Sequence, residues 1–129
     1  MLVHSRLSSK SSFETLLRNA LLDSLPEEAW QAAVRGDEAS LLAWLDSGGR
    51  VNAVGGASGS SALMAAAQHG HERAVELLLQ HGAEIDMQHS SGVTAMMLAA
   101  GNGNERVVEL LLRRGAEINK QDSDGNTAL

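Results

Sequence analysis

Short runs of hydrophobic residues return along this chain every 33 positions. Residues 61–88 and 94–121 are identical at 17 of 28 positions, and both contain the run Val-Glu-Leu-Leu-Leu, at 75–79 and 108–112. Self-similarity at a fixed period of about 20–50 residues is typical of proteins built from stacked repeats. The pattern therefore predicts an array of similar units, each of which packs on its neighbours.

Each unit is predicted to contain two short helices followed by an extended segment. Residues 95–100 are good helix formers, but the run is too short and too apolar to be stable alone in water. Gly101 and Gly103 bracket its predicted end, and Asn104 is expected to cap a second helix. Gly115 is expected to end that second helix. Its buried stripe is predicted to be Val107, Val108, Leu110, Leu111 and Leu112.

Less regular copies extend the array in both directions. A shift of 34 residues aligns Gly36 with Gly70, and the extra residue falls in the Gly- and Ser-rich stretch 52–59, where an insertion is tolerated. A fourth copy begins at Asp122 and stops at Leu129, so we expect the chain to be a fragment of a longer array. The predicted repeat domain, 26–129, divides into units at about 26–55, 56–88, 89–121 and 122–129.

The first 25 residues differ from the repeats and are predicted to form a separate N-terminal segment, 1–25. Residues 1–11 are rich in serine and are expected to be flexible, whereas Ser11 and Glu14 have the spacing of a capping box. Apolar positions from Phe13 onward share one helical face, which predicts a helix over 12–24 that caps the first repeat. The alternative is an organelle transit peptide, because the start is basic and lacks acidic residues.

The first repeat carries hydrophobic residues that support a covering helix. Leu42 stands where Glu76 stands in the next copy, and Trp30 and Trp44 would enlarge the covered surface. An apolar residue at a position that is charged in a sibling copy indicates that something packs on it. Pro26 is expected at the first position of the first helix, which suits its missing N–H.

The repeated residues resemble the ankyrin repeat family. The third copy matches the family pattern at Gly92, Thr94, Ala99, Ala100, Gly103, Val107, Val108, Leu110, Leu111, Leu112, Gly115, Ala116 and Asn119. Residues 59–86 match comparably, and residues 26–52 match loosely. The chain departs from the pattern where Ala95 and Met97 replace the family's Pro and His, so packing of Met is expected to replace part of the turn's hydrogen bonding. The resemblance implies an all-α repeat solenoid of stacked helix-turn-helix units with projecting β-hairpin-like loops.

Composition and charge narrow the function classes. The chain is 43% hydrophobic but only 2% aromatic, so its core must be built from Ala, Leu and Val. It has no cysteine, which excludes disulfides, a thiolate nucleophile and cysteine-ligated zinc, and favours a reducing compartment. The net charge of −6 argues against general binding of nucleic acid, and no apolar stretch approaches the roughly 20 residues of a membrane span. We therefore expect neither nucleic acid nor membrane as a partner.

Side chains capable of chemistry follow the repeat and form no catalytic constellation. Ser61 and Thr94 recur as hydroxyls that start a helix, while Glu76 and its copies are expected on solvated faces with Arg partners. One group has metal-binding residue types: His69, His71, His81 and His89. The next copy has asparagines in place of the first two, so the histidines are interpreted as structural. We predict no enzyme activity, no catalytic residues, no metal site and no cofactor.

The resemblance adds one candidate modification site. In the family, an Asn at the end of a repeat can be the substrate of an iron- and oxoglutarate-dependent asparaginyl hydroxylase. Leu111 precedes Glu117-Ile118-Asn119 at a spacing similar to that target. The alternative is that Asn119 only hydrogen-bonds its own turn.

The resemblance also implies a protein–protein interaction module, whose partner protein or peptide lies across the projecting loops and the inner face of the first helices. The positions on that surface that differ most between copies are Ser58, Gln68, His69, Gln88, Ser90, Ser91, Val93, Asn102, Gln121, Ser123, Asp124 and Asn126. Variable tips on a constant frame suit a binding scaffold. The set lacks Trp, Tyr and Arg, so a structural spacer without its own partner is the alternative. We expect a cytoplasmic monomer, with nuclear or organellar locations open, unless the face at 110–112 self-associates.

Overall fold

The computed structural model describes residues 24–56 and 58–128, which form six helices and two short strands. In chain order these are α2 (Glu27–Arg35), α3 (Glu38–Asp46), β1 (Val54–Gly55), β2 (Ser60–Ser61), α4 (Ala62–Gln68), α5 (Glu72–Gln80), α6 (Ala95–Gly101) and α7 (Glu105–Arg113). The helix pair predicted for each period is therefore present three times. The flexible stretch predicted at 1–11 and the helix predicted at 12–24 lie outside the described residues.

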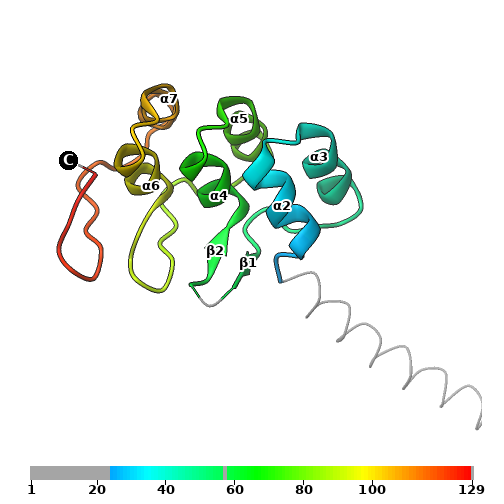
Figure 1. The fold of residues 1–129 in the computed structure, drawn as a ribbon, viewed down its shortest axis with the longest axis horizontal. Coiled ribbons are helices and arrows are strands. Elements are labelled where there is room, and N and C mark those ends of the chain that lie inside the picture. Colours follow the sequence, from blue (N-terminus) through cyan, green and yellow to red (C-terminus); the bar gives the residue numbers. More distant parts are fainter. Residues whose placement is uncertain (1–23, 57, 129) are drawn as a thin grey trace, which may run out of the picture.

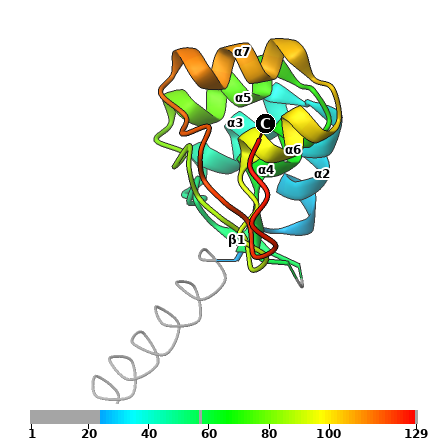
Figure 2. The ribbon, with the colours of Figure 1, turned by 90° about the vertical axis from the view of Figure 1, so that its left-hand side faces the viewer.

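The helices form two layers that run along the array (Figure 1). The first helices of the units, α2, α4 and α6, pack side by side, and we call them the inner helices. The second helices, α3, α5 and α7, form the other layer and are called the outer helices. The loops between units project together from one side of the array (Figure 2). Because each helix contacts its counterpart in the next unit, stability is approximately a sum over neighbouring units.

Hydroxyl side chains start the inner helices α4 and α6, as the sequence predicted. The Oγ of Ser61 accepts a hydrogen bond from the backbone N–H of Met64 at 3.3 Å. The Oγ1 of Thr94 accepts the equivalent bond from Met97, also at 3.3 Å. Both hydroxyl residues are buried, so each bond satisfies a helix N–H group that has no partner within its own helix.

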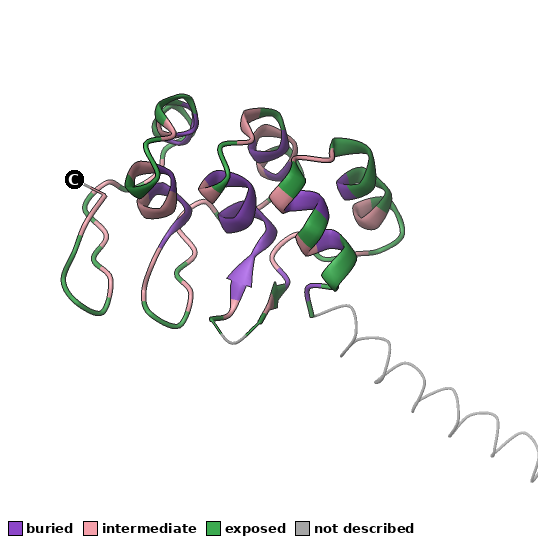
Figure 3. Ribbon diagram, in the orientation of Figure 1, coloured by how far each residue is buried: buried purple, intermediate pink, exposed green. Residues whose placement is uncertain are grey.

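The core is thin and lies between the units, with α4 at its centre. Every residue of 62–67 is buried, as the colouring of Figure 3 shows for this helix. Four of these six residues are alanines, which let α4 pack closely between α2 and α6. Met64 is 1% exposed, so it packs in the core at the position where the family pattern has His.

Two details differ from the sequence-based expectations. Pro26 is the extended residue before α2, with ψ 151°, and the helix begins one residue later at Glu27. Leu112 is 44% exposed and does not belong to the buried stripe, because Leu111 occupies the side of α7 that faces the core. Leu42 is 39% exposed, and the helix predicted to cover it, 12–24, lies outside the described residues.

The first projecting loop has a longer paired stem than the later ones. Strand β1 pairs with β2 in antiparallel register, with Val54 opposite Ser61 and Gly55 opposite Ser60. The two later loops are each closed by two backbone bonds. The His89 N–H donates to the Val93 carbonyl at 3.0 Å and the Gly92 N–H to the His89 carbonyl at 2.8 Å, while Asp122 donates to Asn126 at 2.9 Å and Gly125 to Asp122 at 3.0 Å. The extra residue that the 34-residue spacing placed in 52–59 therefore lies in the loop that contains the strands.

Candidate partner-binding surface

Successive units are joined by a slot that combines a glycine from one unit with a polar side chain from the next. Gly36 follows α2 with φ +71°, and a Cβ at this position would lie 2.6 Å from the Cγ of His71. The Nε2 of His71 lies 2.6 Å from the carbonyl oxygen of Val34. Since a carbonyl only accepts, Nε2 carries the proton and donates it. The ring therefore joins the start of α5 to the end of α2.

The second slot uses different chemistry at the same place. Gly70 follows α4 with φ +74°, and a Cβ there would lie 2.9 Å from the Oδ1 of Asn104. The Nδ2 of Asn104 donates to the carbonyls of Ala67 at 3.0 Å and Gln68 at 2.8 Å. Asn104 was predicted to cap its own helix, and it is the residue that precedes α7, but its side chain makes no capping bond. Its amide donates instead to carbonyls at the end of the preceding inner helix, which lie within its reach.

A second set of bonds joins the units behind the projecting loops. The Oδ1 of Asn52 accepts from the backbone N–H of Glu84 at 2.8 Å, and the Oδ1 of Asp86 accepts from Glu117 at 2.8 Å. Asn119 occupies the next equivalent position and is exposed. In the two earlier units, the side chain at this position therefore accepts a hydrogen bond from the following repeat. The alternative stated for Asn119 was a hydrogen bond within its own turn.

The projecting loops are tied to one another in a row. The backbone N–H of Ser90 donates to the Ser58 carbonyl at 2.9 Å, and that of Ser123 donates to the Ser91 carbonyl at 2.8 Å. The Nε2 of Gln88 donates both to the carbonyl of Gly92 in its own loop, at 2.7 Å, and to that of Gln121 in the next loop, at 2.9 Å. We call these three bonded loops, 54–56 with 58–61, 88–93 and 121–126, the loop row. It holds the tips in fixed register.

The tip of the last loop is organised by a carboxylate. The Oδ1 of Asp122 accepts from the backbone N–H groups of Asp124 at 2.9 Å and Asn126 at 2.8 Å. These bonds, of which the one from Asn126 is the strongest influence, hold the pKa of Asp122 below its ordinary value of 3.8. In the preceding loop His89 has the matching position, and its Nδ1 accepts from the Ser91 N–H at 3.0 Å. Two different acceptors thus build the same turn.

The twelve residues predicted for partner binding lie at the surface but fall into two groups. Ten are exposed, and Gln68 and Val93 are half-buried. The loop row contains Ser58, Gln88, Ser90, Ser91, Val93, Gln121, Ser123, Asp124 and Asn126. Gln68, His69 and Asn102 lie instead where α4 and α6 end, separated from the loops by about 10 Å of helix. The structure therefore brings nine of the twelve together along the loops.

One surface residue was missed as a binding candidate. Trp30 was expected to belong to the surface covered by residues 12–24, which lie outside the described residues; within these, its half-buried ring lines a hollow of about 240 Å³ beside the first loop. The hollow is lined by Leu25, Glu27, Trp30, Gly55, Gly56 and Ser58. The 34-residue shift that aligns Gly36 with Gly70 also aligns Trp30 with Met64, a residue of an inner helix. That alignment was the signal that could have placed the ring next to the loops.

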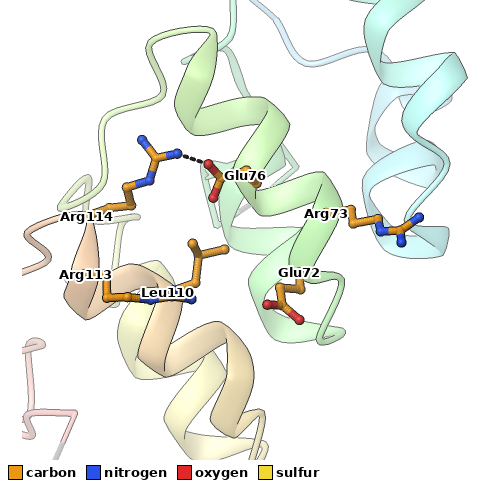
Figure 4. A pocket seen from close by; sticks show the side chains of 6 residues that line it. All are labelled: Glu72, Arg73, Glu76, Leu110, Arg113 and Arg114. Carbon is orange, nitrogen blue, oxygen red and sulfur yellow. Dashed lines mark ion pairs between the residues drawn. The ribbon is translucent and has the colours of Figure 1, made fainter.

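A larger and more open groove, of about 510 Å³, lies between the outer helices α5 and α7 (Figure 4). Arg114 forms an ion pair with Glu76 across it, which confirms that Glu76 has an Arg partner on a partly solvated face. The side chain of Arg73 points away from this pair, and Leu110 lies between the two helices (Figure 4). Glu72 and Arg113 complete a lining of mixed charge, which selects neither anions nor cations.

The described histidines make mainly local contacts, and the rings of His69 and His71 stack with their centroids 6.5 Å apart. His71 bonds the preceding unit, the Nδ1 of His81 lies 2.9 Å from the Leu77 carbonyl, and His89 builds a loop turn. Among residues 24–56 and 58–128, no three side chains of His, Cys, Asp or Glu are grouped so that they could hold a metal ion. A search of the same residues finds no helix that is long and apolar enough to cross a membrane.

Comparison with known proteins agrees with this architecture. A family model described as ankyrin repeats, in three copies, matches residues 29–122. No curated protein matches the sequence. The matched span covers all six helices except the first two residues of α2, and it includes the first residues of the last loop.

Proposed function

The chain belongs to the ankyrin repeat family, and we propose that it is a protein–protein interaction module that binds another protein or a peptide through the loop row and the inner helices. Ankyrin repeats are generally protein–protein interaction modules and typically non-enzymatic scaffolds. The observation that carries the proposal is the loop row itself. Its exposed tips are held in register by bonds between successive loops, so a partner meets a prearranged surface.

The roles within this surface are not equal. Gln88 and Ser123 use their side chains to join one loop to the next, so we assign them to positioning the loops. Ser90, Ser91 and Asp124 are exposed beside these bonds and are assigned to direct contact with the partner. Their side chains are small and polar, which favours a partner that offers hydrogen-bonding groups along an extended stretch of chain.

The three residues beyond the loops form the other end of the proposed surface. Gln68, His69 and Asn102 stand where the inner helices end, and the Nδ2 of Asn102 already donates to the Leu98 carbonyl at 2.8 Å. A partner that touches both groups must lie along the inner helices α4 and α6. A short peptide bound to the loop row alone would leave this end untouched.

Substitution with bulky, charged residues tests the surface. We would select binding peptides from a random displayed library on the intact chain and measure their affinity for Ser91→Arg, Asn102→Arg and the double variant. The double variant is expected to weaken binding at least tenfold, because two arginines would occupy the contact surface. If Ser91→Arg weakens peptide binding and Asn102→Arg does not, the binding site is restricted to the loop row.

A matched control places the same added charge on the opposite layer. Ala39 and Gln80 are exposed on the outer helices α3 and α5, and Ala39→Arg combined with Gln80→Arg should leave the affinity unchanged. If the double variant at Ser91 and Asn102 binds as tightly as this control, the mapped surface is not the binding site.

A spacer without its own partner is the second candidate, and one observation favours it. Several side chains of the surface, including Gln88, Ser123 and Asn126, are already bonded within or between the loops. In that role the loop row would only stiffen the array. Failure to select any peptide, together with a single sharp melt of a monomer, would support this function over recognition.

A further inference from the structure

The hollow beside the first loop has walls of two different kinds. Its apolar part consists of Leu25, which is 8% exposed, and the half-buried ring of Trp30. Its polar part is the carboxylate of Glu27, in the first turn of α2, and the exposed edge of Gly56 and Ser58. No lysine or arginine lines it among the described residues. Among the described residues, the hollow therefore combines an aromatic face with a carboxylate that no lining cation neutralises and whose Oε1 accepts from the Nε2 of Gln31 at 2.9 Å.

The size of the hollow limits what it can hold. Its volume of about 240 Å³ is below the roughly 300–1,000 Å³ of pockets that enclose small molecules. It suits one long side chain that enters from a partner on the loop row, because Ser58 belongs to both surfaces. A side chain that fits must have an apolar stem for Leu25 and a cation for the carboxylate.

We propose that this hollow receives an arginine side chain of the partner, with the guanidinium placed between the indole of Trp30 and the carboxylate of Glu27. Trp is the aromatic residue that attracts cations most strongly, and the planar guanidinium stacks on aromatic faces. The inference rests on the proposed interaction function and names the partner's anchoring residue. This site adds a large aromatic side chain, that of Trp30, to a binding surface whose loop positions have none.

The other tryptophan provides an internal comparison. Trp44 lines a larger hollow of about 600 Å³ on the other side of α2, whose lining includes Glu27, Glu28 and Arg35. Arg35, which pairs with Asp37 at 4.0 Å, adds a cation to the lining of that hollow, so an added guanidinium gains less there. Because the chain has two tryptophans, its NMR spectrum contains two indole N–H signals, one for each hollow.

The test is a titration of the intact ¹⁵N-labelled chain with N-acetyl-arginine N-methylamide. We expect the indole signal of Trp30 to shift with saturation while that of Trp44 stays in place. The neutral analogue N-acetyl-citrulline N-methylamide, which has nearly the same shape, should shift the Trp30 signal at least threefold less at equal concentration. N-acetyl-norleucine N-methylamide, whose side chain is aliphatic and uncharged, measures how much of the shift of the Trp30 signal comes from the apolar stem alone.

Two variants assign the effect to the two walls. Glu27→Gln removes the charge and keeps the size, and it should weaken binding of the arginine probe about two- to fivefold, as expected for an exposed ion pair. Glu28→Gln is the matched control, because Glu28 lies one residue further along α2 and does not line this hollow. The control should leave the affinity for the probe unchanged.

The outcomes separate this inference from the proposed function. Equal shifts with arginine and citrulline, equal shifts of both indoles, or no shift of Trp30 would overturn the arginine site and leave the loop row untouched. Conversely, the double variant Ser91→Arg and Asn102→Arg should still bind the arginine probe, since neither residue lines the hollow. Peptides that bind independently of Ser91 and Asn102 would overturn the mapped surface but not the arginine site.

Discussion

At the scale of single residues, the contacts that matter most to this array connect different units. His71 and Asn104 stand at the same place in successive copies and bond the end of the preceding inner helix. Each fits only because the facing residue, Gly36 or Gly70, has no side chain. These bonds add donors at the last carbonyls of a helix, of which that of Ala67 also accepts from the Gly70 N–H at 3.2 Å. Losing one of these donors should therefore weaken the contact between two successive units and not only one helix.

The two neighbouring asparagines of the third unit allow a direct measurement of that difference. Asn104→Ala removes the donor for the carbonyls of Ala67 and Gln68, and we expect the free energy of unfolding to fall by about 1–2 kcal/mol. Asn102→Ala removes an exposed bond within one helix and should cost less than about 0.5 kcal/mol. Urea denaturation of both variants checks this. Equal losses would mean that the slot adds nothing beyond a surface hydrogen bond.

The same residues show which contacts could be predicted from the sequence and which could not. Ser61 and Thr94 were predictable as helix starts because their partners lie three residues away and the pair recurs with the period. Asn104 was misassigned because its partners lie 36 and 37 residues earlier, in another unit, where local capping rules do not apply. A single sequence therefore predicts contacts within a unit better than contacts between units.

At the scale of elements, the loops act as one structure although each contains few hydrogen bonds of its own. The strands β1 and β2 have two residues each, and each later loop is closed by two backbone bonds. A two-stranded hairpin of this length is not stable alone in water. Bonds between neighbouring loops supply the missing order, and Gln88 contributes to two loops at once.

Gln88 is therefore expected to control the order of the loop that follows it. Gln88→Ala should speed amide hydrogen exchange at Ser123, whose N–H donates to Ser91, by about three- to tenfold, the effect of losing one net hydrogen bond. Gln121→Ala is the matched control, since only the backbone carbonyl of Gln121 accepts the bond from Gln88. If both variants exchange at the wild-type rate, the loops are ordered without this bridge.

The loop positions of the candidate site were predictable, but the arrangement of the site was not. Period and resemblance placed Ser90, Ser91 and Asp124 on projecting tips, and the structure finds them exposed there. Trp30 was assigned to the surface that the N-terminal helix would cover, and that helix lies outside the described residues. The alignment of Trp30 with Met64 places the ring on an inner helix, but the hollow that it lines depends on how the first loop folds back.

At the scale of the whole molecule, burial is concentrated in the middle unit. All of 62–67 is buried, whereas the equivalent Met97 and Ala100 in the last inner helix are only partly covered. Leu42 and Leu112 are exposed on the outer helices at the two ends of the described array. Since roughly three stacked units are the minimum for stability, the ends should limit the stability of the chain.

A shortened chain tests the covering predicted for Leu42. We expect the chain that begins at Ser24 to melt cooperatively, because the junctions described above remain, but at a lower temperature than residues 1–129. A loss of about 1 kcal/mol corresponds to roughly 4 °C for a chain of this size. Thermal unfolding followed by circular dichroism provides the comparison. Identical melting curves would contradict a capping role for residues 12–24.

The slots also determine how such an array can grow. The second unit contributes a donor, His71, to the junction before it and a glycine, Gly70, to the junction after it. A tandem duplication of one complete period therefore brings both halves of each new junction, wherever the duplicated stretch begins. Duplication of a single helix would leave a glycine without its donor. Duplication of the whole period of 33 residues therefore preserves the junctions between units, whereas duplication of one helix does not.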